Sequence, residues 1–428
     1  MQDPLPIRPL SGPVDAVVQV PGSKSYTNRA LLIAAMAEGH SVLRGALFSE
    51  DTERMADSLR RLKLRVEEDA ADARYEVWGQ GGRIPAEEAE LFVGNAGTAT
   101  RFLVAFLGVG HGRYRVDGVP RMRQRPIQPL LDALQSLGVR AYSEEGTGCP
   151  PVRIEADGMA GGEVSLPGDS SSQYFSALLM VGPLTRNGLT LHVEREMVSK
   201  PYIDLTADVM AAFGATMERD PEYRILRVPG GQQYWPRDYQ VEPDASNASY
   251  FFAAAAISGG RVRVPGLGRG SAQGDLELLR VLEEMGCTVT RGADFVEVQG
   301  PERLRAVSVD ANAFSDMAQT LYAIAPFAEG VTEVRNVAHS RLQECDRVSA
   351  SAAELRRLGQ EVEELPDGLR ITPRPVTPAV VQTYHDHRMA MAFALVGLRA
   401  EGVQIADPGC TAKTFPDYWQ RLERLRTS

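Results

Sequence analysis

The sequence predicts an α/β protein with two domains, each built from three similar units. Its 428 residues exceed what one hydrophobic core usually supports. A helix of small residues followed by glycine and a β-rich run occurs six times, and the glycines that close these helices recur every 70–76 residues. Because this period is too long for a solenoid repeat, each unit is predicted to be a small α/β subdomain.

The pattern is clearest in Val20–Glu38, which begins as a strand and becomes a helix. Pro21 and Gly22 end the extended run, and Ser23 or Ser25 can cap the helix that follows. The six predicted stretches are Ser25–Leu43, Gly97–Val116, Ser172–Val193, Ser246–Val264, Asp316–Val334 and His387–Ile405, and their closing glycines are Gly39, Gly112, Gly188, Gly260, Gly330 and Gly402.

A second element recurs in phase with the first. It is an amphipathic helix that stops at glycine and enters a strand, as in LLDALQSLGVRAY and LTADVMAAFGATME. Gly138, Gly214, Gly286 and Gly359 end four copies, and Lys63 stands at this position in a weaker fifth copy. Each unit is therefore predicted to run strand, helix, strand, helix and further strands.

The domain boundary is predicted where the repeat is interrupted. The stretch from Pro229 to Asp238 is rich in proline, glycine and polar residues, which is typical of a linker. The strand before Pro21 can pair with either half, and nothing local decides which.

Composition excludes several classes of protein. The net charge is −10, with 46 Lys and Arg against 56 Asp and Glu, which argues against a nucleic-acid surface. No apolar run is long enough to span a membrane, and the N-terminus does not resemble a signal peptide, so a cytoplasmic protein is predicted. The four cysteines lie far apart and the six histidines form no zinc pattern, so neither disulfides nor a metal site are expected.

Polar residues gather at the start of the first helix in every unit. Lys24 and Arg29 lie where unpaired backbone N–H groups and the helix dipole already favour an anion. In a pseudo-symmetric two-domain protein these helix starts are expected to point into one cleft. The residues at the six starts are Lys24, Ser25 and Arg29; Asn95, Thr98 and Arg101; Ser171, Ser172 and Gln173; Asp244, Ser246 and Asn247; Ser315 and Asp316; and Asp386, His387 and Arg388.

Three further segments add bases to this set. Arginines stand at 121, 123 and 125 before a predicted helix, the segment RLQECDR mixes bases with acids, and Lys413 lies in the turn DPGCTAKTF. Arginine forks suit carboxylate and phosphate, whereas lysine is a point charge that can also exchange a proton. A small ligand that carries both kinds of anionic group is therefore predicted.

The motifs VPGSKSYTNRALL, LFVGNAGTATR, DSSSQYFSALLM, YHDHRMAMAFAL and DPGCTAKTFPDYW resemble the EPSP synthase family of enolpyruvyl transferases, in order along essentially the whole chain. The resemblance implies a two-domain inside-out α/β barrel, with three β-α-β-α-β-β units per domain. It places the first domain at residues 21–240 and the second at 1–20 and 241–428, with crossovers near 20–21 and 236–241.

The resemblance also implies a reaction. The enolpyruvyl group of phosphoenolpyruvate is transferred to the 5-hydroxyl of shikimate 3-phosphate by addition and elimination through a tetrahedral intermediate. No metal and no cofactor are implied, the partners are the two small-molecule substrates rather than nucleic acid or membrane, and a monomer is expected.

Site residues follow from the same resemblance, position by position. Lys24, Asp316 and Glu344 match the catalytic groups: Lys24 contacts both substrates, Asp316 is the base for the hydroxyl, and Glu344 exchanges the methylene proton. The phosphoenolpyruvate side matches Lys24, Asn95, Gly97, Arg125, Gln173, Arg347, Arg388 and Lys413; the shikimate 3-phosphate side matches Lys24, Ser25, Arg29, Ser171, Ser172, Gln173, Tyr202, Asp316 and Gln343; Asp51 and His387 match supporting residues.

One position departs from the family pattern. Gln343 stands where the family usually has lysine, and His339 stands where some members have asparagine. Loss of that lysine predicts weaker acceptor binding, by about 1–3 kcal/mol for a charge-assisted hydrogen bond. Two alternatives therefore remain open: transfer to a different acceptor, or a catalytically impaired anion-binding paralog.

Three other families fit less well. The UDP-N-acetylglucosamine carboxyvinyltransferases depend on a cysteine that Val109–Arg125 lacks. A dinucleotide-binding fold is disfavoured because the glycines of Gly266–Gly270 have the wrong spacing, and a P-loop is disfavoured because its first glycine is missing before Lys24.

Overall fold

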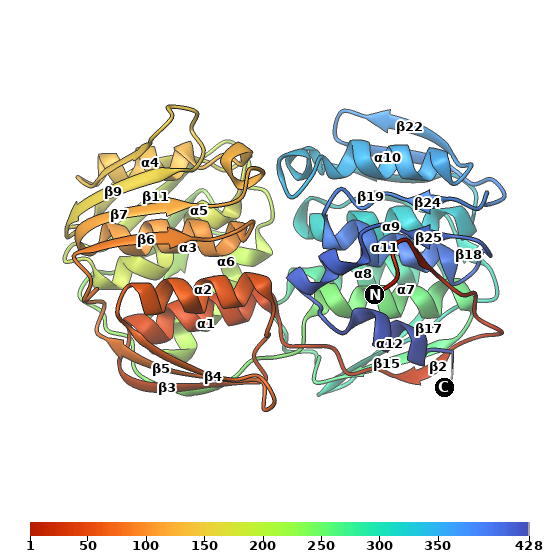
Figure 1. Ribbon diagram of the computed structural model, residues 1–428, viewed down its shortest axis with the longest axis horizontal. Coiled ribbons are helices and arrows are strands. Elements are labelled where there is room, and N and C mark those ends of the chain that lie inside the picture. Colours follow the sequence, from red (N-terminus) through yellow and green to blue (C-terminus); the bar gives the residue numbers. More distant parts are fainter. Residues whose placement is uncertain (427–428) are drawn as a thin grey trace. The chain divides into compact units, whose positions relative to one another are not determined.

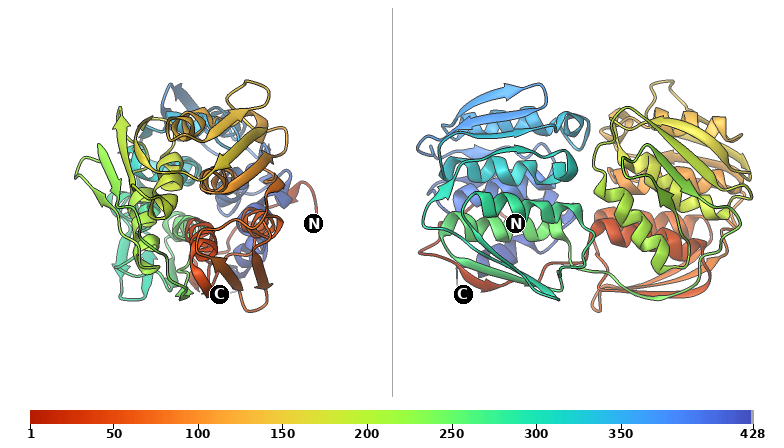
Figure 2. Two further views of the ribbon diagram at one scale, coloured as in Figure 1. Left: turned by 90° about the vertical axis from the view of Figure 1, so that its left-hand side faces the viewer. Right: turned by 180° about the vertical axis from the view of Figure 1, so that it is seen from behind.

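The computed structural model describes residues 1–426, and the chain divides into two compact units. Unit 2 is Gly22–Val241, and unit 1 combines Met1–Pro21 with the chain from Glu242 onward. Each unit has a hydrophobic core of its own. Within each unit the sheets lie outside and the apolar helices lie inside (Figure 1, Figure 2).

Unit 2 contains three four-stranded sheets with the same topology. In each sheet the first strand runs parallel to the second, and the remaining two strands pair antiparallel. The sheets in spatial order are β14 (Asp238–Gln240), β3 (Glu38–Arg44), β5 (Arg74–Gln80) and β4 (Arg65–Asp69); β6 (Glu88–Phe92), β7 (His111–Asp117), β9 (Val152–Asp157) and β8 (Arg140–Ser143); and β10 (Gly162–Pro167), β11 (Leu189–Glu194), β13 (Ile225–Val228) and β12 (Glu218–Arg219).

Unit 1 repeats this topology twice and adds smaller sheets. Its four-stranded sheets are β2 (Asp15–Val17), β15 (Arg261–Pro265), β17 (Phe295–Gln299) and β16 (Thr288–Arg291); and β19 (Ser308–Asp310), β21 (Thr332–Arg335), β23 (Gly368–Thr372) and β22 (Glu361–Leu365). The smaller sheets are β1 (Leu5–Pro6), β25 (Gln404–Ile405) and β24 (Val380–Val381); and β18 (Leu304–Arg305) with β20 (Ala328–Glu329).

The first helix of each repeat is the buried one. In α3 every residue from Gly97 to Gly108 is buried, and in α1 every residue from Tyr26 to Met36 is buried. Small and apolar residues on all sides let a helix be enclosed completely. The buried helices are α1 (Lys24–Met36), α3 (Gly97–Gly108) and α5 (Ser172–Val181) in unit 2, and α7 (Ala245–Ser258), α9 (Ala318–Ile324) and α11 (His387–Gly397) in unit 1.

The second helix of each repeat is amphipathic, as predicted. In five copies a residue with left-handed backbone conformation follows the helix. Gly138, Gly214, Gly286 and Gly359 have φ of 87°, 91°, 105° and 83°, and Lys63 has φ of 65°. Lys63 therefore takes the conformation of its glycine counterparts. These helices are α2 (Glu50–Arg61), α4 (Gln128–Ser136), α6 (Pro201–Ala212), α8 (Leu278–Glu284) and α10 (Arg347–Arg357), followed by α12 (Tyr418–Arg424) near the end of the chain.

Short 3-10 turns join these elements, and four of them, η3, η4, η6 and η7, carry residues discussed below. They are η1 (Met122–Gln124), η2 (Gly182–Leu184), η3 (Gly274–Glu277), η4 (Asn312–Met317), η5 (Ala325–Phe327), η6 (Ala338–Leu342) and η7 (Pro408–Lys413).

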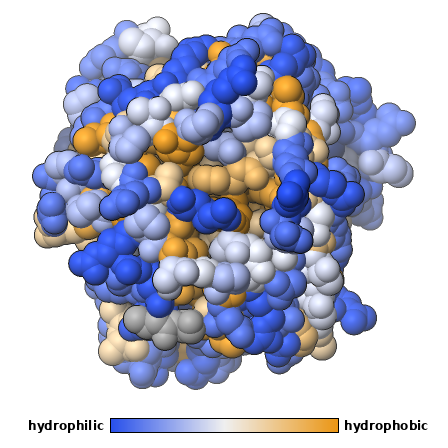
Figure 3. Space-filling model, turned by 90° about the vertical axis from the view of Figure 1, so that its right-hand side faces the viewer, coloured by the Kyte–Doolittle hydropathy of each residue, from blue (hydrophilic) through white to orange (hydrophobic). Residues whose placement is uncertain are grey.

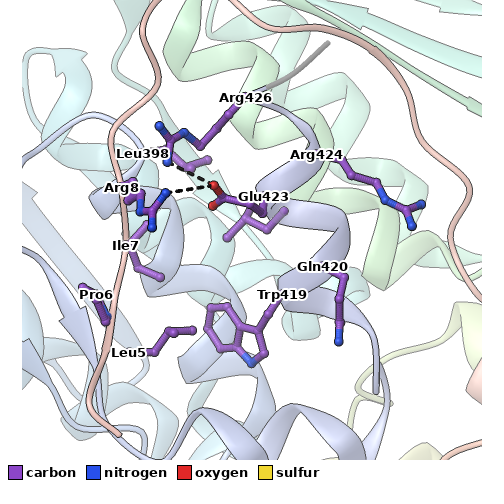
Figure 4. Close-up of a pocket in the computed structure, with 11 residues that line it drawn as sticks. Leu5, Pro6, Ile7, Arg8, Leu398, Trp419, Gln420, Glu423, Arg424 and Arg426 are labelled. Carbon is purple, nitrogen blue, oxygen red and sulfur yellow. Dashed lines mark hydrogen bonds and ion pairs between the residues drawn. The ribbon is translucent and has the colours of Figure 1, made fainter. Parts of the chain in front are cut away.

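The N-terminal segment belongs to unit 1, which settles the choice that the sequence left open. Strand β2 pairs in parallel with β15, with Ala16 opposite Val262. Farther upstream, residues 5–8 and α12 line a groove of about 490 Å³, whose apolar wall includes Leu398 and Trp419 (Figure 4). In this groove Glu423 forms ion pairs with both Arg8 and Arg426.

The surface of the face in Figure 3 is mainly hydrophilic, with apolar side chains gathered in a central hollow. Among residues 1–426, no helix is both long enough and apolar enough to cross a membrane.

Replacement of Lys63 by glycine is expected to stabilise the protein. A side chain at φ 65° costs about 1 kcal/mol, and glycine removes this cost. The matched control is Gly138→Ala, where an added Cβ meets nothing within 4 Å and only the conformational cost remains, so that variant should lose about 1 kcal/mol. Denaturant unfolding measures both; a Lys63→Gly variant no more stable than wild type would contradict the assignment.

Candidate active site

Lys24 is the first residue of α1 and forms an ion pair with a carboxylate of the next helix. Ser23 caps α1 by accepting a hydrogen bond from the Tyr26 N–H, as the sequence predicted for one of two serines. The Lys24 Nζ lies 3.6 Å from Asp51 Oδ2, and the Asp51 side chain is only 3% exposed. The ammonium is thereby held at the positive end of a helix, where it adds to the attraction for an anion.

Arg29, one turn farther along α1, points into unit 2. Its guanidinium donates to Thr206 Oγ1, Ser176 Oγ and the Tyr202 and Ser25 carbonyl oxygens, and the residue is 1% exposed. Burial lowers the pKa of Arg29 to about 10, which leaves it charged at neutral pH. Arg29 thereby ties the start of α6, which carries Tyr202, to α1, which carries Ser25.

Arg125 lies over the start of α3. Its Nη1 donates to the Asn95 carbonyl oxygen at 2.9 Å and to Asn95 Oδ1 at 3.2 Å. A Cβ built on Gly97 would come within 2.4 Å of Arg125 Nη2, so only glycine lets the guanidinium approach the helix start this closely. The result is a guanidinium held against the first residue of α3.

Two buried side chains fix the loop that carries Arg125. Arg101 Nη2 and the Tyr174 hydroxyl both donate to the Pro126 carbonyl oxygen, at 2.7 Å each. Because Arg101 comes from α3 and Tyr174 from α5, the loop is tied to both buried helices.

The start of α5 completes this group in unit 2. Ser171 caps the helix by accepting from the Gln173 N–H, and Gln173 Nε2 donates to Thr98 Oγ1 of α3 at 3.4 Å. Ser172 is 4% exposed. The polar starts of α3 and α5 are therefore joined by a hydrogen bond.

In unit 1, Arg347 is the centre of a buried charge cluster. Its guanidinium pairs with Asp386 at 2.7 Å, with Asp316 at 2.9 Å and with Glu344 at 3.0 Å. Burial acts to lower the pKa of Arg347, but the three carboxylates overcome this and raise it. One cation thus keeps three carboxylates together, two of them buried.

Arg388 and Asp386 stand at the start of α11. Asp386 caps the helix by accepting from the Arg388 N–H at 2.9 Å, and His387 Nδ1 lies 3.4 Å from the same carboxylate. The Arg388 guanidinium lies 2.6 Å from Asp316 Oδ2. Asp316, at the end of the kinked turn η4, therefore contacts two arginines and is still 19% exposed at its side chain.

Glu344 contacts a second cation besides Arg347. Lys413 Nζ from η7 lies 3.7 Å from Glu344 Oε1, and both side chains are 7% exposed. Gln343 Oε1 accepts a hydrogen bond from Arg347, a bond that the lysine usual in the family could not accept.

His339 packs beside Asp316 through Ser315. Its Nε2 lies 2.8 Å from Ser315 Oγ. Burial lowers the pKa of His339 to about 4, opposed by Asp316 and assisted by Arg347. The imidazole is therefore neutral at physiological pH.

Each unit thus carries cations near helix starts, and unit 1 also carries three carboxylates beside Arg347. Such carboxylates can take and return protons while the cations hold a charged substrate. Among residues 1–426, no group of three or more His, Cys, Asp or Glu side chains has the arrangement of a metal site.

The family model described as EPSP synthase (3-phosphoshikimate 1-carboxyvinyltransferase) matches residues 10–422. The chain belongs to the EPSP synthase family. It is 50% identical over 423 residues to the 3-phosphoshikimate 1-carboxyvinyltransferase of a Nostoc species, covering 99% of both chains. It is 47% identical to that of Erwinia tasmaniensis, again over 99% of each, and 46% identical to the chloroplastic protein of Brassica napus, over 98% of this chain and 84% of the relative.

Solved structures confirm the predicted enolpyruvyl transferase fold. EPSP synthase from Acinetobacter baumannii superposes with a TM-score of 0.82 at 24% identity, covering 98% of this chain and 97% of the other. The enolpyruvyl transferase NikO from Streptomyces tendae superposes with a TM-score of 0.76 at 22% identity, with the same coverage.

The site residues of the family resemblance divide between the two units. Unit 2 holds Lys24, Ser25, Arg29, Asp51, Asn95, Gly97, Arg125, Ser171, Ser172, Gln173 and Tyr202, and unit 1 holds Asp316, Gln343, Glu344, Arg347, His387, Arg388 and Lys413. Asp275 was not foreseen, although it stands at the start of the amphipathic helix of its repeat, as Asp51 does. That positional match is the signal that could have found it.

His339 is expected to make stability fall as pH falls from about 6.5 to about 4. The unfolded chain binds the imidazole proton below pH 6.5, but the folded chain does so only near 4, so acid favours unfolding across this window. Because the ring is only partly buried, we expect His339 to lower the free energy of unfolding by about 2 kcal/mol across this window. The His339→Gln variant should lack this loss. Unfolding of both proteins at pH 4.5 and 7 measures it, with the exposed His111→Gln as control. An equal pH dependence in wild type and His339→Gln would contradict the assignment.

Proposed function

We propose that this chain transfers the enolpyruvyl group of phosphoenolpyruvate to the 5-hydroxyl of shikimate 3-phosphate and releases phosphate. The observation that carries this proposal is the match to 3-phosphoshikimate 1-carboxyvinyltransferases at about half identity along 99% of the chain. The buried acid and base groups in unit 1 and the anion-binding helix starts in unit 2 support it.

The chemistry needs an acid and a base at the same carbon. Protonation of the C3 methylene of phosphoenolpyruvate gives cationic character at C2, and the acceptor hydroxyl then adds there while losing its proton. In the second half the methyl group returns a proton and the C2–O bond to phosphate breaks. Charged residues that are fixed beforehand lower the cost of these charge movements.

Asp316 and Glu344 suit the two proton-transfer roles. Both are carboxylates held beside arginine, Asp316 with 19% of its side chain exposed and Glu344 within 3.7 Å of Lys413. We assign the acceptor hydroxyl to Asp316 and the methylene proton to Glu344. Lys413 can stabilise the charge on Glu344 and on departing phosphate.

The anionic groups of the substrates are assigned to the cations and helix starts. Arg125, Arg347, Arg388 and Lys413, with Lys24, are assigned to phosphoenolpyruvate, together with Asn95, Gly97 and Gln173. Ser25, Ser171, Ser172, Tyr202 and Gln343 are assigned to shikimate 3-phosphate. Arg29 is assigned to the same substrate, and its hydrogen bonds to Ser25 and Tyr202 support an action through these neighbours.

Asp51 and His387 are assigned supporting roles. Asp51 holds Lys24, and His387 stands beside the Asp386 cap. The proposed acid and base belong to unit 1, and Lys24 and Arg125 belong to unit 2.

No observation favours transfer to a different acceptor or an impaired paralog. Gln343 takes part in the Arg347 cluster by accepting its hydrogen bond, so the site is rebuilt around the glutamine rather than left with a missing group. A monomer that acts in the cytoplasm on small-molecule substrates stays a prediction.

Phosphate release from phosphoenolpyruvate, measured with and without shikimate 3-phosphate, tests the proposal. Wild type should release phosphate only with the acceptor, and Asp316→Asn and Glu344→Gln should each lose more than about 10²-fold in kcat, the usual effect of removing an acid or base. The same substitutions at exposed positions of unit 1, Asp294→Asn and Glu302→Gln, are the controls. Acceptor-independent release, or full activity in both site variants, would overturn the proposal.

A further inference from the structure

Asp275 is a buried carboxylate of unit 1 to which the proposed mechanism gives no role. It lies in η3, is 6% exposed, and accepts a hydrogen bond from Ser246 Oγ through Oδ2. Its other oxygen, Oδ1, is buried without a hydrogen-bond partner among the described residues. Gln273 fixes this turn by bonding the Ala245 N–H and the Pro243 carbonyl oxygen.

The internal repeat shows what is unusual about Asp275. Ser23 caps α1 and Asp244 caps α7, so Lys24 and Ala245 occupy the same first position of the two helices. Asp51 stands at the start of the following helix in its repeat and pairs with Lys24. Asp275 stands at the corresponding point of its own repeat but faces alanine, so the lysine partner is missing.

Ser246 links Asp275 to a charged residue of the candidate active site. The Ser246 hydroxyl lies 3.4 Å from Arg388 Nη2, and the same Nη2 lies 2.6 Å from Asp316 Oδ2. Asp275, Ser246 and Arg388 are each at least nine-tenths buried, whereas Asp316 is more exposed. Asp275 and Asp316 thus share one guanidinium, Asp316 directly and Asp275 through a hydroxyl.

The charges around Asp275 do not favour its ionised form. Burial, and then repulsion from Asp316, raise the pKa of Asp275 to about 7, with Arg388 and Ser246 opposing the rise and Asp244 adding to it. In the neighbouring α8, Arg280 pairs with Glu277 and Glu284 on the exposed side of the helix. These charges therefore do not stabilise the ionised form of Asp275. A protonated Asp275 can donate to Ser246, which a carboxylate cannot do.

We propose that Asp275 is a positioning residue for Arg388: it holds Ser246 against the guanidinium, and its ionisation state sets how strongly Arg388 attracts an anionic substrate. When Asp275 is neutral, the guanidinium of Arg388 still pairs with the Asp316 carboxylate. When Asp275 loses its proton, a further negative charge lies two hydrogen bonds from the Arg388 guanidinium, and Arg388 binds an anion less strongly.

This inference rests on the proposed function, in which the anion bound by Arg388 is phosphoenolpyruvate. It predicts that KM for phosphoenolpyruvate rises as pH increases through 7, while kcat changes by less than about twofold. Asp275→Asn keeps the shape of the side chain and stays neutral at every pH, so it should lack this rise.

The test is KM for phosphoenolpyruvate at saturating shikimate 3-phosphate between pH 6 and 8.5, in wild type, Asp275→Asn and the exposed control Asp294→Asn. Titration of the substrate itself affects all three proteins equally and cancels in the ratio of KM values. The ratio of wild type to Asp275→Asn should rise about fivefold across this range, as expected for one added charge near the site. The ratio of wild type to Asp294→Asn should stay constant.

A second variant tests the contact through the Ser246 hydroxyl separately from the charge of Asp275. Ser246→Ala keeps the Asp275 carboxyl group but removes the hydroxyl that contacts Arg388, so KM should rise about threefold or more at every pH. This variant also tests the link if Asp275→Asn folds poorly. An unchanged KM in Ser246→Ala overturns the proposal.

Thermal unfolding tests the buried proton without any assay of activity. Because the pKa of Asp275 is raised in the folded state, the stability tied to its proton is full below about pH 4 and is lost as pH rises to about 7. The melting temperature of wild type should therefore fall relative to that of Asp275→Asn between pH 4 and 7. Above pH 7 the difference between the two melting temperatures should stay constant.

The outcomes separate this inference from the proposed function. A constant KM ratio, with or without the melting difference, overturns the link to Arg388 while the function stands. If no protein releases phosphate, the proposed function has failed, and calorimetric binding of phosphoenolpyruvate takes the place of KM in the same comparison. Equal affinity of wild type and Asp275→Asn at pH 6 and 8.5 then overturns the inference as well.

Discussion

The buried guanidinium of Arg347 is the interaction on which the arrangement of unit 1 depends. Three carboxylates from three different segments, Asp316, Glu344 and Asp386, converge on it. Each of them would be costly to bury alone, because an unpaired charge in a protein interior costs several kcal/mol. The arginine therefore joins the turn η4, the loop before α10 and the cap of α11 into one rigid group.

The same principle takes a different form in unit 2. There the cations are fixed mostly by neutral oxygens: Arg125 by Asn95, Arg101 by the Pro126 carbonyl, and Arg29 by carbonyl and hydroxyl groups. Carbonyl oxygens orient a guanidinium without cancelling its charge, so unit 2 is suited to bind anions. Carboxylates in unit 1 neutralise much of the local charge but can move protons. The duplicated fold has thus acquired two complementary polar sets.

Much of this could be predicted from the sequence because it depends on local rules. The recurrence of helix-closing glycines identified the repeats, and the same register placed Lys63 at a left-handed position. Capping residues located the helix starts, so the candidate cations and acids were expected near backbone N–H groups. The family motifs then assigned individual roles to these residues, which the present structure does not test.

What could not be predicted depends on contacts between distant segments. The inward direction of Arg29 follows from Ser176 and Thr206, which lie about 150 residues or more away in the chain. The pairing of β2 with β15 joins residues separated by almost 250 positions. The repeat offered a positional signal for Asp275, but its link to Arg388 runs through Ser246, a contact between residues 142 positions apart.

The most direct test of the central role of Arg347 is a double-mutant cycle with Asp386. The variants Arg347→Met, Asp386→Asn and the double variant are unfolded in denaturant, with Trp78 and Trp235 replaced by phenylalanine so that Trp419 reports on unit 1 alone. A coupling free energy of about 2 kcal/mol or more is predicted, because Arg347→Met leaves the buried Asp386 carboxylate without its guanidinium partner, a cost that the double variant avoids. Additive effects of the two substitutions would contradict the account.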